Sequence, residues 1–464
     1  MLFNSIAFLF FFAAVYLIYL PLPLRPQNLL LLAASYFFYA QWDWRFLSLI
    51  LLSTGVDYVI ALGIERHRDS PRAKHLLYLS LGVNLGVLGV FKYYDFFVSS
   101  LEQLLARAGL SFSPTLLGIA VPVGISFYTF QTLSYTIDVY RGRLKPCRDL
   151  TAFALFVALF PQLVAGPIER ATNLLPQILR ARQVTLHKAL SGAQLMGWGL
   201  FKKVVIADNL ALLVVDPIFD PSLNLGGLVV LLGTYAFAFQ IYCDFSGYSD
   251  IAIGCARMLG IDFGPNFNLP YAATSPSDFW RRWHISLSSW LRDYLYIGLG
   301  GNRTGHTMRN LMATMLLGGL WHGASWKFVL WGAFHGLLLI VYKQAGQWRW
   351  TQQVSSGLRW VVMFHLTCLG WLIFRANNVR HFVDLVQSFL QDFFIINDPD
   401  GTLTAHFLFF AGPLIVVQIL QHKLGVGIAR RLPWPLQGAA YCMLFYTFIT
   451  FGEFGGNEFI YFQF

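Results

Sequence analysis

The chain has 464 residues, of which 56% are hydrophobic and only 12% are Asp, Glu, Lys or Arg. Soluble domains carry about 25% charged residues, so this composition excludes an ordinary soluble domain and indicates a protein embedded in membrane lipid. The formal net charge of +10 would suit a nucleic-acid partner only if the bases gathered on a soluble face. They fall instead in short stretches between apolar segments, so we expect no nucleic-acid partner.

Apolar segments close to the length of a membrane span recur along the whole chain, since a helix needs about 20 such residues to cross. In chain order they are 5–24, 28–41, 46–63, 76–98, 115–138, 189–216, 228–257, 309–320, 326–343, 357–375, 405–421 and 434–451. Two more, 149–166 and 265–300, are too broken or too amphipathic for simple spans. We expect an all-α polytopic membrane protein with about 11–12 transmembrane helices plus re-entrant or amphipathic helices, in a single domain over residues 1–464.

The basic residues suggest an orientation, because Lys and Arg collect in short cytoplasmic loops. Basic clusters occur at residues 66–74, 141–148, 343–359 and 423–431, whereas residues 377–404 are rich in Asp. These positions agree with one another if both termini face outward. They also place the turn that contains His322 on the outward side. The first apolar segment lacks a basic start and a small-residue cleavage site, so we expect a first span and not a removable signal.

The stretch Trp321-His322-Gly323-Ala324-Ser325 places an ionisable imidazole between two apolar segments, 311–320 and 326–341. Such a group at membrane depth is costly unless it is paired or lines a cavity, so His322 is a functional candidate. The alternative is a histidine at an interfacial turn that bonds to a backbone carbonyl. These residues alone leave both interpretations open.

Residues 275–293 predict one interfacial or re-entrant helix. Ser275 or Ser277 can cap it, and Pro276 and Asp278 suit its first turn. His284 would project with its apolar stripe, either as a functional group or as a packed histidine bonded to a carbonyl. Arg281 and Arg282 would lie largely on the other side, where they could bind lipid headgroups or the phosphates of an anionic donor.

Asp244 and Asp250 lie six residues apart in an otherwise apolar segment, with Tyr248 between them. Buried carboxylates suggest a proton pathway, partners for buried bases such as Lys202 and Lys203, or the polar lining of a tunnel. We treat Asp244, Tyr248 and Asp250 as channel or donor-binding candidates. The five cysteines are scattered without the spacing of metal ligands, so we expect buried hydrophobic residues, no metal site and no disulfide framework. We also expect no bound cofactor.

Several ordered motifs resemble the membrane-bound O-acyltransferase family, in particular its bacterial branch that O-acetylates exported polysaccharides. The teichoic acid D-alanylation proteins are more distant relatives. The similar segments run from the N-terminus to the last residue and include 122–128, 138–142, 244–250, 279–288 and 318–323.

The resemblance implies that His322 is the essential catalytic histidine, in a channel that joins a cytoplasmic and an outward funnel. It implies that His284 is the second, supporting histidine and that acetyl-CoA is the acyl donor. Neutral imidazole can deprotonate an acceptor hydroxyl near pH 7, and Trp321, His284 or backbone amides could stabilise the oxyanion. The expected setting is the bacterial inner membrane, with periplasmic O-acetyltransferase proteins and a polysaccharide synthase complex as partners.

The chain ends in Phe459-Ile460-Tyr461-Phe462-Gln463-Phe464, which resembles a terminal aromatic motif of this branch. On the outward side, the Tyr461 hydroxyl could accept an acyl group and pass it to a periplasmic transferase. The alternative is an aromatic anchor at the membrane interface.

Three other functions stay open. A proton-coupled transporter or flippase would use the buried Asp and His residues as a proton relay. A protein or lipid acyltransferase of the same fold would use a longer acyl donor. A non-catalytic scaffold of a polysaccharide export complex would cleave no thioester. The polymer that would be acetylated is not readable from the chain; alginate and cellulose are the leading candidates, and peptidoglycan or another glycan is the alternative.

Overall fold

The computed structural model describes residues 1–164, 166–223, 225–346, 353–395, 398, 400–425, 431–455 and 459–460. All regular secondary structure in these residues is helical, which confirms the all-α prediction. Six helical stretches among them are long and apolar enough to cross a membrane: Leu24–Arg66, Pro71–Arg107, Gly227–Met258, Trp326–Ala345, Ser356–Arg375 and Thr402–Leu424. The chain is therefore a polytopic helical membrane protein, and the larger number of spans that we expected stays a prediction.

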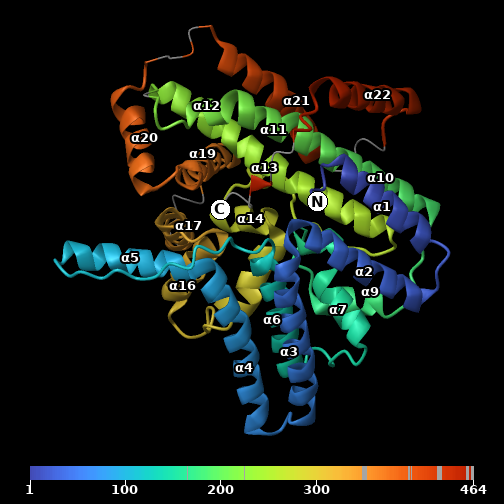
Figure 1. Ribbon diagram of the computed structural model, residues 1–464. Helices are drawn as coiled ribbons and strands as arrows, with labels where there is room; N and C mark the ends of the chain where they lie inside the picture. Colours follow the sequence, from blue (N-terminus) through green and yellow to red (C-terminus); the bar gives the residue numbers. More distant parts are fainter. Residues whose placement is uncertain are drawn as a thin grey trace. The chain divides into compact units, whose positions relative to one another are not determined.

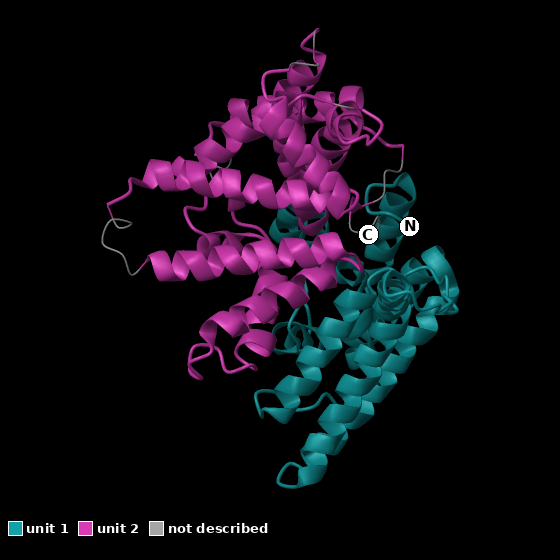
Figure 2. Ribbon diagram, turned by 90° about the vertical axis from the view of Figure 1, so that its left-hand side faces the viewer, with its two compact units in different colours: residues 1–196, 251–264 teal, residues 197–250, 265–464 magenta. Residues whose placement is uncertain are grey.

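The fold contains two compact units, residues 1–196 with 251–264 and residues 197–250 with 265–464 (Figure 2). Helices α10 (Leu186–Leu200) and α13 (Gly227–Met258) contribute residues to both. The expectation of a single domain over residues 1–464 stays a prediction.

The first unit begins with long helices and continues with shorter ones (Figure 1). Its elements are α1 (Ile6–Tyr19), α2 (Leu24–Asp43), η1 (Trp44–Phe46), α3 (Leu47–Arg66), α4 (Pro71–Leu88), η2 (Gly89–Tyr93), α5 (Tyr94–Arg107), α6 (Ile125–Tyr140), α7 (Leu150–Ala158), α8 (Phe160–Leu163) and α9 (Ala171–Ile178), followed by most of α10.

A buried polar cluster joins α3, α4 and α6 within this unit. Ser80 donates to one oxygen of Asp57 at 2.5 Å, and the Asn84 amide donates to the other at 2.9 Å. Ser53 in turn donates to the side-chain oxygen of Asn84, which also accepts from Thr132 on α6. Polar groups in an apolar surrounding are tolerated when their hydrogen bonds are made inside the protein, and this cluster satisfies that condition.

The segment predicted to span the membrane from residue 115 becomes helical only at Ile125, so that prediction was wrong over its first ten or so positions. Gly118 and Gly124 adopt positive φ angles of 58° and 74°, which a helix does not allow. A β-carbon on Gly124 would lie 2.5 Å from the backbone oxygen of Leu163. Glycine at this position therefore permits both the turn and the close approach.

The second unit holds the remaining elements (Figure 1). They are η3 (Phe201–Ala207), α11 (Asp208–Leu210), η4 (Ala211–Val215), α12 (Asp216–Ile218), η5 (Pro270–Ala272), α14 (Pro276–Arg282), α15 (Ile285–Trp290), η6 (Leu291–Tyr296), α16 (Thr307–His322), α17 (Trp326–Ala345), α19 (Ser356–Arg375), α20 (Val379–Gln391), α21 (Thr402–Leu424) and α22 (Trp434–Phe451), together with the first part of α13. All the predicted site residues except Tyr461 lie in the described part of this unit.

Candidate active site

Helices α16 and α17 pack closely enough to fix the turn between them, and His322 is the last residue of α16. A β-carbon on Gly319 would lie 2.1 Å from the backbone oxygen of Phe328, and one on Gly332 would lie 2.3 Å from that of Met315. Because no side chain fits at either position, the two glycines allow the backbones to touch, as small residues do between membrane helices.

Aromatic rings surround the His322 imidazole, which is only 4% exposed. Its ring centroid lies 4.9 Å from that of Trp331 on α17 and 5.6 Å from that of Phe374 on α19, both edge to face. The ring of its neighbour Trp321 lies 5.1 Å away. His322 is thus a buried side chain in an aromatic surrounding.

The single helix predicted over residues 275–293 is interrupted at His284, so that prediction was wrong. The predicted start is confirmed, because Ser275 caps α14 by accepting from the Asp278 amide. However, α14 ends at Arg282, and His284 has φ 42° and ψ 57°. This left-handed conformation costs a non-glycine residue about 1–3 kcal/mol and persists only where the surrounding structure imposes it.

Asn266 imposes that conformation on His284. Its backbone oxygen accepts from the Ile285 amide at 2.9 Å, and its side-chain oxygen accepts from the Ser286 amide and hydroxyl. The two amides that follow His284 are therefore bonded to Asn266 and not to the preceding helical turn. This explains why the chain leaves the helix at this residue.

The same contacts determine the tautomer of His284. The Ser286 amide is only a donor, so the Asn266 side-chain atom that it meets must be the oxygen, and the opposite Nδ2 donates to Ser249 at 3.0 Å. His284 Nδ1 lies 3.2 Å from that oxygen and must therefore carry the proton. Burial lowers the pKa of His284 to about 3, so the ring is neutral and Nε2 holds the lone pair.

The Trp321 ring contacts the rings of both histidines. Its indole centroid is 5.8 Å from the His284 ring and 5.1 Å from the His322 ring. The structure therefore brings together three of the predicted site residues, from α16 and from the break between α14 and α15. What each contributes to catalysis stays a prediction.

Asp244 belongs to a buried ion-pair network. The Lys203 ammonium lies 2.5 Å from Asp244 Oδ1 and 2.8 Å from Asp208 Oδ1, and all three side chains are at most 4% exposed. Asp250 pairs with Lys202 at 2.7 Å, and Lys202 also donates to Ser246. Of the three possibilities for these carboxylates, partnership with buried bases is the one that these contacts match.

Tyr248 lies one turn after Asp244 and is 1% exposed, with its ring centroid 5.7 Å from the Lys203 ammonium. Arg281 and Arg282 both pair with Asp278, at 3.7 Å and 3.1 Å. The Arg281 side chain is 70% exposed, whereas that of Arg282 is 27% exposed, so Arg281 is the more accessible to a lipid or substrate phosphate. Tyr461 lies outside the described residues.

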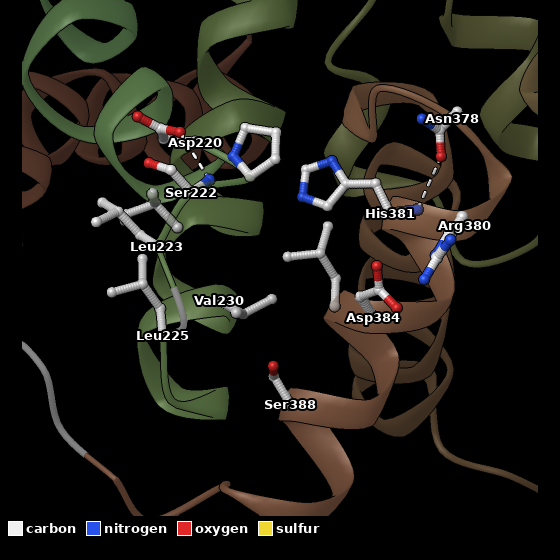
Figure 3. Close-up of a pocket in the computed structure, with 13 residues that line it drawn as sticks. Asp220, Ser222, Leu223, Leu225, Val230, Asn378, Arg380, His381, Asp384 and Ser388 are labelled. Carbon is white, nitrogen blue, oxygen red and sulfur yellow. Dashed lines mark hydrogen bonds between the residues drawn. The ribbon is translucent and has the colours of Figure 1, made fainter.

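A separate cavity of about 400 Å³ lies between the loop before α13 and helix α20 (Figure 3). Asp220, Ser222 and Leu223 line one side, and Asn378 and His381 line the other. The Asn378 side chain caps α20 by accepting from the His381 amide at 2.9 Å. None of the predicted site residues lines this cavity.

Comparisons with known proteins show the family of this chain. The sequence pattern described as MBOAT, membrane-bound O-acyltransferase family, matches residues 148–374. A protein named probable alginate O-acetylase AlgI, from Azotobacter vinelandii, is 48% identical over 387 residues, which cover 82% of this chain and 76% of that protein. The chain belongs to the membrane-bound O-acyltransferase family. It is an O-acyltransferase enzyme, as its motifs predicted.

Two further relatives extend the comparison of this acyltransferase. The peptidoglycan O-acetyltransferase of Helicobacter pylori is 33% identical over 529 aligned positions, which cover 100% of this chain and 98% of that protein. The teichoic acid D-alanyltransferase of Bacillus subtilis is 28% identical over 278 positions, covering 56% of this chain and 70% of that protein. The family match spans both histidines and ends before Tyr461.

Sequence reasoning missed three residues of this acyltransferase site. Asn266 holds His284, Trp331 packs against His322, and His335 lies 4.7 Å from Trp331, ring to ring, while being 2% exposed. Trp331 and His335 are four residues apart on α17, which puts both on one helix face. That spacing, next to the His322 turn, could have marked them. Nothing in the spacing of Asn266 connects it to His284.

Proposed function

We propose that this acyltransferase takes acetyl from cytoplasmic acetyl-CoA and passes it across the bacterial inner membrane, where an exported polysaccharide is O-acetylated. The observation that carries the proposal is the pair of buried histidines, His322 and His284, whose rings both contact that of Trp321. The relatives that cover most of the chain are named for O-acetylation, one of alginate and one of peptidoglycan. Alginate and cellulose are our leading acceptors.

His322 suits the role of general base. It ends α16, and the negative end of a helix dipole stabilises the imidazolium that forms when the base takes a proton. The acceptor hydroxyl oxygen attacks the thioester carbonyl carbon as the imidazole takes its proton. The carbon–sulfur bond then breaks and the proton passes to the thiolate, so an ester and free coenzyme A thiol are formed.

His284 suits a supporting role, because a third group orients it as in other catalytic constellations. With Nδ1–H directed at Asn266, its Nε2 lone pair can accept a hydrogen bond from the acceptor hydroxyl. Trp321 lies beside both rings and carries an indole N–H that could donate to the developing oxyanion. Aromatic walls exclude water, which strengthens these polar contacts.

We further propose that Tyr461 receives the acetyl group and passes it to periplasmic O-acetyltransferase proteins that act beside a polysaccharide synthase complex. Both termini would then face the periplasm. The support is the resemblance of the aromatic motif that contains Tyr461 and the basic-residue pattern of the loops. In this relay the Tyr461 phenol is the hydroxyl that attacks the thioester.

The experiment uses the full chain in proteoliposomes with acetyl-labelled acetyl-CoA. His322→Ala should lose label transfer by at least roughly 100-fold, in line with the usual contribution of a general base. The control is His306→Ala, because His306 is an exposed histidine just before α16. Correct insertion of both variants is checked by their melting temperature.

Each of the following results would contradict the proposal or a part of it. Equal turnover in His322→Ala and His306→Ala would refute the role of His322 as general base. Substrate flux without thioester cleavage would favour a transporter, and no activity with any thioester would favour a scaffold. Faster turnover with a long-chain acyl donor than with acetyl-CoA would favour lipid or protein acylation. An acetyl label that persists on the Tyr461→Phe protein would refute only the relay through Tyr461.

A further inference from the structure

The C-terminal segment contacts the buried ion-pair network. The Ile460 amide donates to Asp244 Oδ2 at 2.9 Å, on the carboxylate whose other oxygen meets Lys203. Among the described residues, the hydrogen-bond donor to Asp244 Oδ2 is the Ile460 amide. A hydrogen bond between an amide and a carboxylate is about twice as strong as one between neutral groups.

The charges of the network explain why it attracts an amide. Two carboxylates, Asp208 and Asp244, share the single ammonium of Lys203. A buried carboxylate needs donors for both of its oxygens, and one ammonium between two carboxylates leaves that need incompletely met. A backbone amide supplies a donor without adding a second positive charge.

The residue before Ile460 fills an aromatic site next to the same aspartate. Phe459 is fully buried, with its ring centroid 4.5 Å from that of Tyr248 and 5.4 Å from that of Phe245. Phe245 in turn packs edge to face on His284 at 4.5 Å. One aromatic ring therefore separates the C-terminal segment from the site histidine.

A second attachment lies upstream in the same segment. The Glu453 amide donates to the backbone oxygen of Val204, directly after Lys203, and the Asn209 side chain donates to the backbone oxygen of Phe451. The end of α22 is thus fixed on η3 and α11, and Phe459 and Ile460 are fixed on α13.

We propose that Asp244, Phe245 and Tyr248 form a docking site for Phe459 and Ile460 of the chain's own C-terminal segment, and that this docking positions His284 for acyl transfer through Phe245. The positioning role rests on the proposed function; the docking does not. Phe245 contacts both Phe459 and His284, so the docked segment holds the ring against which His284 packs. Asp244 and Phe459 act here as positioning residues.

The test measures hydrogen–deuterium exchange of the C-terminal peptides in the full chain, reconstituted in lipid nanodiscs. The Ile460 amide should exchange slowly in the wild type. Phe459→Ala should speed its exchange by roughly ten-fold or more, because local opening costs less without the buried ring. Asp244→Asn should speed it less, since an amide oxygen can still accept. Phe459→Leu should restore most of the protection.

Phe454→Ala is the matched control, because Phe454 belongs to the same segment but is 48% exposed and contacts Phe448. Its exchange at Ile460 should equal that of the wild type. Equal exchange in Phe459→Ala and the wild type would overturn the docking. Faster exchange with undiminished label transfer to the acceptor would overturn the positioning role. Failure of the proposed function would show in the His322 variant and leave the exchange pattern unchanged.

Discussion

Replacing Asn266 by alanine tests whether His284 must be held in one tautomer. The substitution removes three contacts of the side-chain oxygen, with the Ser286 amide, the Ser286 hydroxyl and His284 Nδ1, and one donation to Ser249. The backbone bond from Ile285 to the residue 266 carbonyl survives. The variant should therefore keep the interruption between α14 and α15, while the His284 ring loses its orientation.

The magnitude follows from the bonds lost. A typical hydrogen bond contributes about 1 kcal/mol, and a buried donor left without a partner costs about 1–3 kcal/mol. Asn266→Ala should thus lower the free energy of unfolding by about 2–4 kcal/mol. Transfer activity should fall by roughly 10–100-fold, as when other groups that orient a functional histidine are removed.

Asn266→Asp separates the two effects, since a carboxylate still accepts from His284 Nδ1 and Ser286. The new negative charge favours the imidazolium, so it should raise the pKa of His284 from its value of about 3. If activity needs neutral His284, the acid limb of the pH–rate profile should move to higher pH in this variant. Activity of Asn266→Ala within about two-fold of wild type would refute the role that we assign to the tautomer.

The remaining predictions concern stability, measured by thermal unfolding of the protein in detergent. Gly332→Ala should lower the melting temperature, because its β-carbon would lie 2.3 Å from a backbone oxygen, whereas Gly412→Ala, with open space around it, should raise it slightly. The pKa of His284 is lowered in the folded state, so the unfolded chain binds more protons between about pH 3 and 6.5; stability should fall as pH falls through this window, and less so in His284→Gln. Lys203→Met should cost about 3–5 kcal/mol by leaving two buried carboxylates unpaired, and Lys202→Met should cost less, because its carboxylate partner is 22% exposed.

The sequence predicted those features that depend on apolar length and local motifs. The helices on either side of His322 follow from long apolar segments, and the start of α14 follows from Ser275 and Pro276. The buried pairing of Asp244 was among the alternatives, because an isolated carboxylate in an apolar segment needs a base. Which lysine would meet it depends on how η3 packs against α13, which no local pattern contains.

The break at His284 could not be predicted, because residues 279–291 have the spacing of an uninterrupted helix. Two hydrogen bonds that Asn266 accepts, from the Ile285 and Ser286 amides, override this local helix propensity, although Asn266 lies 18 positions before His284. Such contacts between distant residues override periodicity where a site needs a strained residue. The left-handed conformation of His284 is therefore better explained by the site than by the helix that contains it.

Adjacent residues of α13 connect the histidine site with the C-terminal segment. Phe245 contacts both His284 and Phe459, while Asp244 binds the Ile460 amide. Neighbouring sites that share a residue do not contribute independently, so substitutions at Phe459 and Asn266 should not add in transfer activity. If Phe245 transmits the position of the C-terminal segment to His284, transfer activity in the double variant should fall by less than the product of the two single falls. Falls that simply multiply would mean that the C-terminal segment acts only by its own position and has no effect on the histidine.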